Sequence, residues 1–398
     1  MVLELFGPEG RAAREDWSLD PGVRHLNHGG FGAVPAAVGT YQQALRVTAE
    51  RDPLTWFRRL PARVARAREE VADWLGAPRE ATALVANASA GATAVLSSLP
   101  LRAGDRVLVT DHVYGAVGMA VRRHAARAGA EVDSVAVPLD ADGPATAALV
   151  RTALDAGPTP ALLVVDHITS ATARLMPVAE IAADCRERGV RLLIDGAHAP
   201  GQLARPLEGL HGAYWVGNLH KWPCAPRGTA VLVADPVDEA ERQLLHPPID
   251  GWGAPDPYPV RFDVQGTGDF SNWLAAPTAL RLIEERYGWD RARAHMAGLS
   301  GWAQSFVAER WGVELKGLPA EPAPGMRLVP LPAGIAADPR AAAALQEELS
   351  EKYGCATAVT SWNGRGFVRL SAHVYNTEAD YRDLVERVGR RPLLGDGD

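Results

Sequence analysis

One lysine of the chain has a setting that favours covalent chemistry. Lysine occurs only at Lys221, Lys316 and Lys352, so lysine chemistry has few candidates. Lys221 follows apolar sequence and is flanked by Trp222 and Pro223. Burial among apolar groups disfavours the charged form, lowers the lysine pKa, and makes the amine a nucleophile toward carbonyls. A surface lysine after a strand is the alternative that this segment leaves open.

A carboxylate ends another apolar stretch, RLLIDGAHAPG. Asp195 follows the apolar residues, and His198 lies three residues further on. A buried carboxylate needs a cationic partner, and the protonated pyridine nitrogen of pyridoxal 5′-phosphate is one such partner. His198 is near enough in sequence to reach the same ligand. A structural aspartate that caps the next turn is the alternative.

Small residues begin a predicted helix in the segment NASAG, residues 87–91. Ser89 is a suitable N-cap for a helix over residues 89–99. Backbone N–H groups at a helix start bind anions, and small side chains let a phosphate approach them. Helix capping without a ligand is the alternative.

The elements that must position these residues alternate between apolar strands and helices. Parallel sheets covered by helices on both faces show this rhythm, and their ligands bind at the carboxyl ends of the strands. A loop rich in proline and glycine follows over residues 246–269, and shorter strands and helices come after it. The predicted strands are 83–85, 105–110, 131–137, 161–165, 191–194, 213–216 and 229–233.

The composition excludes several classes of protein. With 398 residues, 47% of them hydrophobic and 22% charged, the chain is globular and long enough for more than one domain. A net charge of −7 is unlike a dedicated nucleic-acid binder. Three cysteines without CxxC spacing favour a reducing compartment. We therefore expect a cytoplasmic protein without a secretory signal, a membrane span, a nucleic-acid partner or a metal site.

Seven segments carry a resemblance to a known family. They are LNHGGFGAVP (26–35), TDHVYGAV (110–117), DHITSATARLMP (166–177), DGAHAPG (195–201), GNLHKWPCAPRG (217–228), GTGDFSNWLAAP (266–277) and RLSAHVYNTEAD (369–380). In this order they resemble the class V aminotransferase family of fold-type I pyridoxal phosphate enzymes, and within it the isopenicillin N epimerase-like branch. The resemblance covers roughly residues 25–390.

The resemblance implies an α/β fold, with a mostly parallel seven-stranded sheet in a large domain and a smaller C-terminal α+β domain. We predict an N-terminal arm over residues 1–24, a large domain that binds pyridoxal 5′-phosphate over 25–269, and the small domain over 270–398. The resemblance further implies a homodimer with shared active sites.

The same resemblance assigns three catalytic residues. Lys221 matches the lysine that binds the cofactor covalently. Asp195 matches the carboxylate that keeps the pyridine nitrogen protonated, and His198 stands near the ring hydroxyl. Tyr114 matches an aromatic residue that stacks on the cofactor ring, with His112 as the fallback.

Further residues are assigned to the cofactor or to the substrate. The expected cofactor contacts are the backbone of Ser89 and Ala90, with Ser170, Asn218, His220 and, across a dimer interface, Thr267. Arg369 matches the arginine that binds the substrate carboxylate, a task that suits a bidentate fork. Asn27 and His28 match a loop near the substrate.

Three reactions stay open at this point. The first is epimerisation at Cα of a bulky cysteine-derived metabolite, as in antibiotic biosynthesis and other secondary metabolism. The second is C–S β-elimination from an S-substituted cysteine, and the third is decarboxylation with deamination, or transamination. Cysteine desulfurase activity is disfavoured because the segment TSWNGRGFVR, residues 360–369, has no cysteine before Arg369.

Overall fold

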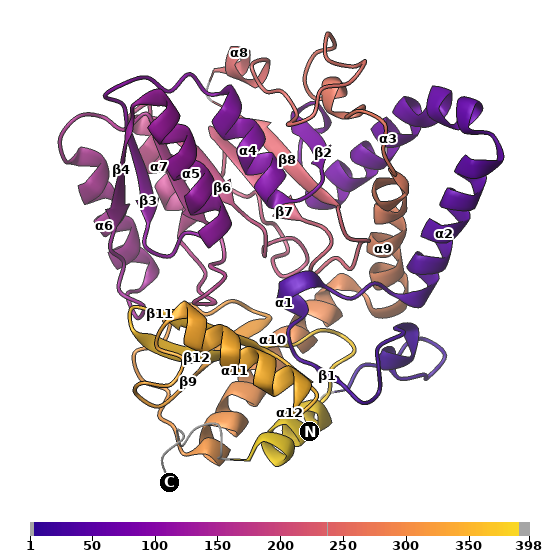
Figure 1. Cartoon of the computed structure of the whole chain (residues 1–398), viewed down its shortest axis with the longest axis vertical. Coiled ribbons are helices and arrows are strands. Elements are labelled where there is room, and N and C mark those ends of the chain that lie inside the picture. The colour runs from indigo at the N-terminus through magenta and orange to yellow at the C-terminus, as the bar shows by residue number, and fades with distance from the viewer. Residues whose placement is uncertain (1–3, 237, 390–398) are drawn as a thin grey trace.

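A seven-stranded sheet forms the centre of the computed structural model, which describes residues 4–236 and 238–389 (Figure 1). Its strand order is β2-β8-β7-β6-β5-β3-β4. Strand β8 runs antiparallel to both of its neighbours, and the other pairs are parallel. The strands are β2 (Thr82–Val85), β3 (Arg106–Thr110), β4 (Glu131–Val135), β5 (Leu162–Asp166), β6 (Arg191–Asp195), β7 (Ala213–Asn218) and β8 (Ala230–Asp235). This sheet confirms the predicted fold class.

Strand β5 shows why the central strands are apolar on both faces. Leu163 and Val165 join one core cluster, which also contains residues of α3, α6, α7 and α9. Leu162 and Val164 point the other way and join a cluster with residues of α4 and α5. These helices are α3 (Pro53–Leu75), α4 (Ala88–Ser98), α5 (Gly115–Ala128), α6 (Gly143–Asp155), α7 (Val178–Glu187) and α9 (Ser271–Tyr287). Two buried faces leave the carboxyl ends of the strands as the place for a ligand.

A smaller three-stranded antiparallel sheet, of order β11-β12-β9, is built from the C-terminal part of the chain. The elements are α10 (Trp289–Trp311), β9 (Met326–Pro330), α11 (Pro339–Glu351), β11 (Ala358–Trp362), β12 (Arg365–Ser371) and α12 (Glu378–Val388). Strand β1 (Arg24–His25) pairs with β10 (Cys355–Ala356), so the N-terminal segment is joined to this part (Figure 1). The remaining elements are η1 (Ala13–Asp16), α1 (His28–Phe31), α2 (Ala36–Arg51), η2 (Arg79–Ala81), α8 (Glu239–Arg242) and η3 (Val260–Phe262).

The division into domains stays a prediction. Helix α9 packs against α2 and α3, and Trp273 and Leu280 of α9 share a core cluster with Leu192 of the large sheet. Residues 1–3 of the predicted arm and 390–398 of the predicted small domain lie outside the described residues. In the part of the chain that is described, none of the helices combines the length and the hydropathy that crossing a membrane requires.

Candidate active site

A cavity of about 210 Å³ lies at the carboxyl ends of β5, β6 and β7. The predicted residues among those that line it are Ser89, Tyr114, Ser170, Asp195, His198, Asn218, His220 and Lys221. Its other lining residues are Gly30, Phe31, Asn87, Ala88, Asp166, Ile168 and Ala197. The fold thus brings residues from distant parts of the sequence to the sheet edge where ligands of such sheets bind.

A lysine amine and a histidine meet in this cavity. The Nζ atom of Lys221 lies 3.1 Å from Nε2 of His198, and Nδ1 of His198 accepts a hydrogen bond from the Trp222 indole N–H at 3.4 Å. An indole N–H only donates, so neutral His198 carries its proton on Nε2 and donates it to the amine. This arrangement needs an unprotonated lysine.

Burial accounts for the protonation states of this pair. The pKa of Lys221 is lowered to about 8, mainly by burial and also by the charge of Arg369, against the attraction of Asp195 and Asp166. Burial also lowers the pKa of His198 well below its ordinary value, and the charge of Lys221 adds to that effect. A neutral amine in reach of a ligand can act as a nucleophile or as a base.

Two aspartates end neighbouring strands in this cavity. Asp166 of β5 and Asp195 of β6 are register partners, and both side chains are buried. Asp195 accepts a hydrogen bond from the Ala197 N–H at 3.0 Å, and Asp166 accepts one from the Tyr114 N–H at 3.3 Å. Burial raises the pKa of both carboxyl groups, and the charge of Asp195 raises that of Asp166 further. The pair therefore retains a proton more readily than two exposed aspartates.

Asp166 was missed by the sequence analysis. The signal was available, because LLVVD ends in an aspartate after an apolar strand just as RLLID does. A strand-end carboxylate in a parallel sheet lies at the ligand-binding edge whichever strand carries it.

The start of α4 differs from the prediction. Asn87 is the N-cap, and its side-chain oxygen accepts from the Ala90 N–H at 2.8 Å, so the prediction that Ser89 caps this helix is wrong. Asparagine is at least as good a cap as serine, and here it stands two residues earlier. The Ala88 N–H donates to Asn218 at 2.8 Å. Ser89 lies in the first turn and lines the cavity, whereas the N–H of Ala90 is already bonded to the cap.

His220 is a neutral group at the same end of the cavity. Its Nδ1 atom lies 3.0 Å from the Thr229 carbonyl, to which it donates. Burial lowers its pKa to about 4. With Nδ1 as the donor, the Nε2 atom of neutral His220 is an acceptor.

Arg369 is a buried cation beside the cavity. It donates to Ser170 Oγ at 3.2 Å and to Asn27 Oδ1 at 3.0 Å, and Ser170 lines the cavity. Burial lowers its pKa to about 10, so it stays charged at neutral pH. Among the residues that the structure describes, no carboxylate forms an ion pair with Arg369, and its Nε atom is buried without a hydrogen-bond partner. A buried guanidinium without an anion suits a carboxylate ligand.

Besides Arg369, four predicted residues lie outside the cavity wall. Asn27 holds Arg369, and His28 lies beneath the lysine with its Nε2 atom 3.0 Å from the Lys221 carbonyl. Thr267 lines a different hollow, together with Phe57 and Trp252. The fourth residue is Ala90, described above. The fallback residue for ring stacking, His112, stacks on Trp362 at 4.7 Å, whereas Tyr114 lines the cavity.

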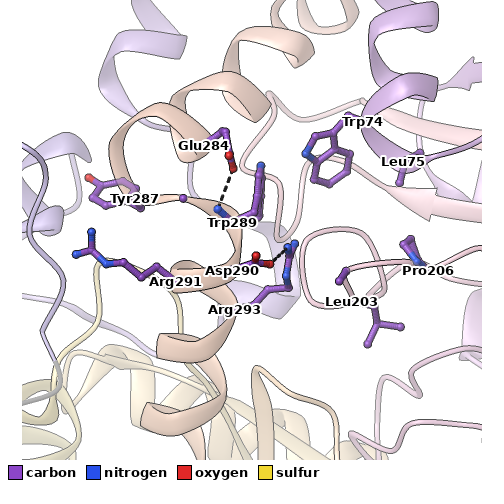
Figure 2. A pocket seen from close by; sticks show the side chains of 12 residues that line it. Trp74, Leu75, Leu203, Pro206, Glu284, Tyr287, Trp289, Asp290, Arg291 and Arg293 are labelled. Atoms are coloured by element: carbon purple, nitrogen blue, oxygen red, sulfur yellow. Dashed lines mark hydrogen bonds and ion pairs between the residues drawn. The ribbon is translucent and has the colours of Figure 1, made fainter.

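A larger cavity of about 520 Å³ lies where α9 meets α10, and Figure 2 shows its lining. None of the predicted site residues lines it. Arg293 pairs with Asp290 at 2.7 Å, and Glu284 accepts a hydrogen bond from the Trp289 N–H at 2.9 Å (Figure 2). These charged groups are thus matched within the chain, so the smaller cavity is the candidate active site.

The groups in the smaller cavity fit pyridoxal 5′-phosphate. Lys221 offers an amine to the aldehyde, and Asp195 offers a buried carboxylate to the pyridine nitrogen. Ser89 in the first turn of α4 and the amide of Asn218 stand where a phosphate would lie at a helix start.

Comparisons with known proteins agree with this assignment. Residues 32–384 match the family model described as Aminotransferase class-V. The chain is 31% identical to isopenicillin N epimerase of Streptomyces clavuligerus, over 94% of this chain and 96% of that protein. It is 31% identical to putative L-cysteine desulfhydrase 1 of Oryza sativa subsp. japonica, over 95% and 84% of the two chains. A mutant of C-DES, solved with glycine covalently linked to the PLP cofactor, has the same fold, with a TM-score of 0.80, 21% identity, and 94% and 98% coverage.

The fold and the site define an enzyme that uses pyridoxal 5′-phosphate. The chain belongs to the class V aminotransferase family, because the family model spans most of it and full-length relatives reach 31% identity. Its relatives include epimerases and cysteine desulfhydrases, so the family alone leaves the reaction open.

Proposed function

We propose that this enzyme removes the Cα proton of an amino-acid substrate, with Lys221 as the base. The observation that carries the proposal is a buried lysine amine of lowered pKa, in hydrogen-bond contact with His198 and near a buried arginine that lacks an anion. When bound, pyridoxal phosphate supplies an electron-withdrawing ring that stabilises the negative charge left at Cα. The hydrogen bond that His198 donates requires the unprotonated form of the Lys221 amine, which is also the form that a base requires.

Arg369 binds the substrate carboxylate in this proposal. Asn27 and Ser170 each hold one nitrogen of its guanidinium, so the fork has a fixed orientation before substrate arrives. A carboxylate bound there limits rotation of the substrate and directs the Cα–H bond toward Lys221. We assign to Asn27 the role of orienting Arg369.

The remaining cavity residues hold the cofactor in this proposal. Asp195 binds the pyridine nitrogen, and Tyr114 covers one face of the ring. Asn218 and Ser89 donate to the phosphate, because they lie at the start of α4 or beside it. His220 donates to it from Nε2, which the negative charge of the phosphate favours in the protonated form. Ser170 contacts the cofactor as well as Arg369.

Epimerisation is the outcome that we propose, with a bulky cysteine-derived amino acid as substrate. Two isopenicillin N epimerases, at 31% and 30% identity over 94% of this chain, support it. The reaction needs the proton to leave one face of Cα and a proton to return on the other face.

A second candidate is C–S β-elimination from an S-substituted cysteine. Lys221 takes the Cα proton, the Cβ–S bond breaks, and the sulfur leaves with the bonding electrons as a thiolate. One observation favours it: the basic side chains Lys221 and His198 lie together, so they serve the same face of a substrate. Elimination needs one base, whereas epimerisation also needs a proton donor on the second face.

We propose that a second copy of this chain covers the hollow that Thr267 lines. The wall of this hollow includes Trp252, whose side chain is fully solvent-exposed, and Phe57, which is partly exposed. Exposed aromatic groups around a hollow are typical of an interface. In a homodimer this surface would place Thr267 at the partner's site. If light scattering gives the mass of a monomer for a preparation that is catalytically active, this proposal is contradicted.

Product analysis in deuterated water tests the proposed function. The loaded enzyme is incubated with a panel of amino acids and S-substituted cysteines. Epimerisation gives an unchanged skeleton with one deuterium at Cα and inverted configuration. Elimination gives a thiol with pyruvate and ammonia. Loss of CO₂ or transfer of the amino group without Cα exchange would contradict both candidates.

A further inference from the structure

Three rings from distant parts of the sequence meet beneath the turn that carries the lysine. We call residues Leu219–Ala225 the lysine turn, which is closed by hydrogen bonds from Cys224 N–H to the Lys221 carbonyl and from Ala225 N–H to the Leu219 carbonyl. His28, His373 and Tyr375 lie against it, and all three are fully buried. The rings of His28 and His373 stack at 3.9 Å.

Both histidines bond to the backbone of the lysine turn. The Nε2 atom of His28 lies 3.0 Å from the Lys221 carbonyl, and that of His373 lies 2.9 Å from the Trp222 carbonyl. A carbonyl only accepts, so each Nε2 carries a proton and donates it. Nδ1 of neutral His28 then accepts from the Tyr375 O–H at 2.8 Å. Burial lowers the pKa of His28 well below its ordinary value and that of His373 to about 3, so both rings are neutral.

The cluster has the composition of a metal site but not its geometry. Ligand atoms of His28, Cys224 and His373 all lie within 4.8 Å of one another. However, both Nε2 atoms face carbonyls, and nearly parallel rings at 18° direct their lone pairs side by side rather than toward one ion. Burial raises the pKa of the Cys224 thiol well above its ordinary value, which disfavours a thiolate ligand. These contacts instead suit two side chains that hold the backbone of the lysine turn in place.

The same two chain segments also hold Arg369. Asn27, which precedes His28, accepts from Arg369, and Arg369 lies on β12, four residues before His373. The segment of Asn27 and His28 therefore contacts the Lys221 backbone through His28 and the Arg369 guanidinium through Asn27. The segment of Arg369 and His373 carries this guanidinium, and its His373 bonds to the carbonyl of Trp222, the residue after the lysine.

We propose that His28 and His373 are positioning residues that clamp the lysine turn and fix the Lys221 amine relative to Arg369. The clamp deepens the proposed function, on which it rests, because a base at Cα must keep a constant distance from the site that binds the substrate carboxylate. Gly32 lets the segment that carries His28 approach the lysine turn, since a Cβ there would lie 2.1 Å from the His220 carbonyl oxygen.

The test compares variants that lose the donor with variants that keep it. His28→Met and His373→Met remove the N–H, whereas His28→Gln and His373→Gln keep an N–H at similar reach. His295→Met is the matched control, because His295 is a buried neighbour of His373 whose Nε2 bonds to the Asn376 carbonyl at 3.1 Å and not to the lysine turn. Circular dichroism and thermal melting identify variants that fold.

The readout is the pH midpoint of Lys221 acylation in the apoprotein, followed by peptide mass spectrometry. Lys316 and Lys352 are exposed and serve as internal references in the same sample. The methionine variants should raise the midpoint of Lys221 by about one pH unit, toward the ordinary lysine value, since a loosened turn exposes the amine to water. In the same variants the dissociation constant for pyridoxal phosphate should rise about tenfold. The glutamine variants and His295→Met should match the wild type.

An unchanged Lys221 midpoint in folded methionine variants, or folded glutamine variants that behave like methionine variants, would overturn the clamp. This outcome differs from a failure of the proposed function. If the wild type catalyses no Cα exchange, the proposed function fails, while the acylation midpoint in apoprotein still decides whether the histidines hold the lysine.

Discussion

The carboxyl groups of Asp166 and Asp195 end neighbouring parallel strands in the same register, so two buried acids stand side by side in the cavity. Only one of them is needed to face a pyridine nitrogen. Their different surroundings separate their tasks: the pKa of Asp166 is raised further, because the charge of Asp195 adds to its burial. Asp166 is therefore the member of the pair that retains a proton more readily, and Asp195 is the one that we assign to the pyridine nitrogen.

Asp195→Asn should keep part of the cofactor affinity but lower kcat about 100-fold or more, because an amide does not keep a ring nitrogen protonated. Steady-state kinetics on the loaded variant, with cofactor content measured from absorbance, checks this. A variant with full cofactor and unimpaired kcat would reject the role of Asp195.

Asp166→Asn should stabilise the apoprotein at neutral pH. The folded pKa of Asp166 is raised above its unfolded value, so the wild type loses stability as pH rises from the unfolded pKa through the folded one. The amide removes this loss, and Tm at pH 7.5 should rise by about 2–4 °C, with a smaller difference near pH 4. Calorimetry across this range is the measurement, and the exposed carboxylate variant Asp290→Asn is the control. An equal effect at both pH values would contradict the raised pKa of Asp166.

Trp222→Phe should lower kcat about tenfold, because the indole N–H no longer sets the tautomer of His198. Trp215→Phe is the matched control, since buried Trp215 donates to His167 in the same way at 3.3 Å. Rate measurements and melting curves on both variants separate the two effects. Equal losses of activity in the two variants would show that the tautomer of His198 is irrelevant.

Arg369→Lys should lower kcat/KM for an amino acid about 100-fold, because a lysine keeps the charge but not the bidentate fork. The corresponding amine, which lacks the carboxylate, should be affected much less. The ratio of the two kcat/KM values is the quantity to compare. An unchanged ratio would place the carboxylate elsewhere.

Apolar runs that alternate with helices were enough to predict the sheet, because strands buried on both faces are continuously apolar. Helix α10 was missed, because its buried face includes polar or small residues such as His295, Ser300 and Ala303, so it contrasts weakly in hydrophobicity with the exposed face. The start of α4 was misplaced because Asn87 and Ser89 are both good caps, and local sequence does not choose between them.

The site was partly predictable for a similar reason. Lys221, Asp195 and Tyr114 follow strands or begin a helix, and the ends of parallel strands must converge. The position of His28 depends on His373 and Tyr375, which follow β12, and on the lysine turn, all far away in sequence. No local pattern specifies such contacts, so the sequence predicted this residue near the substrate, whereas it lies against the backbone of the lysine.

The most direct test of the central claim is hydrogen exchange at Cα of an accepted amino acid in deuterated water, followed by mass spectrometry. Wild type and Lys316→Ala, both loaded with pyridoxal phosphate, should incorporate deuterium at similar rates. Lys221→Ala should fold, yet exchange at least about 1000-fold more slowly, because the base at Cα is gone. Exchange by Lys221→Ala at the wild-type rate would contradict the assignment of Lys221 as the base.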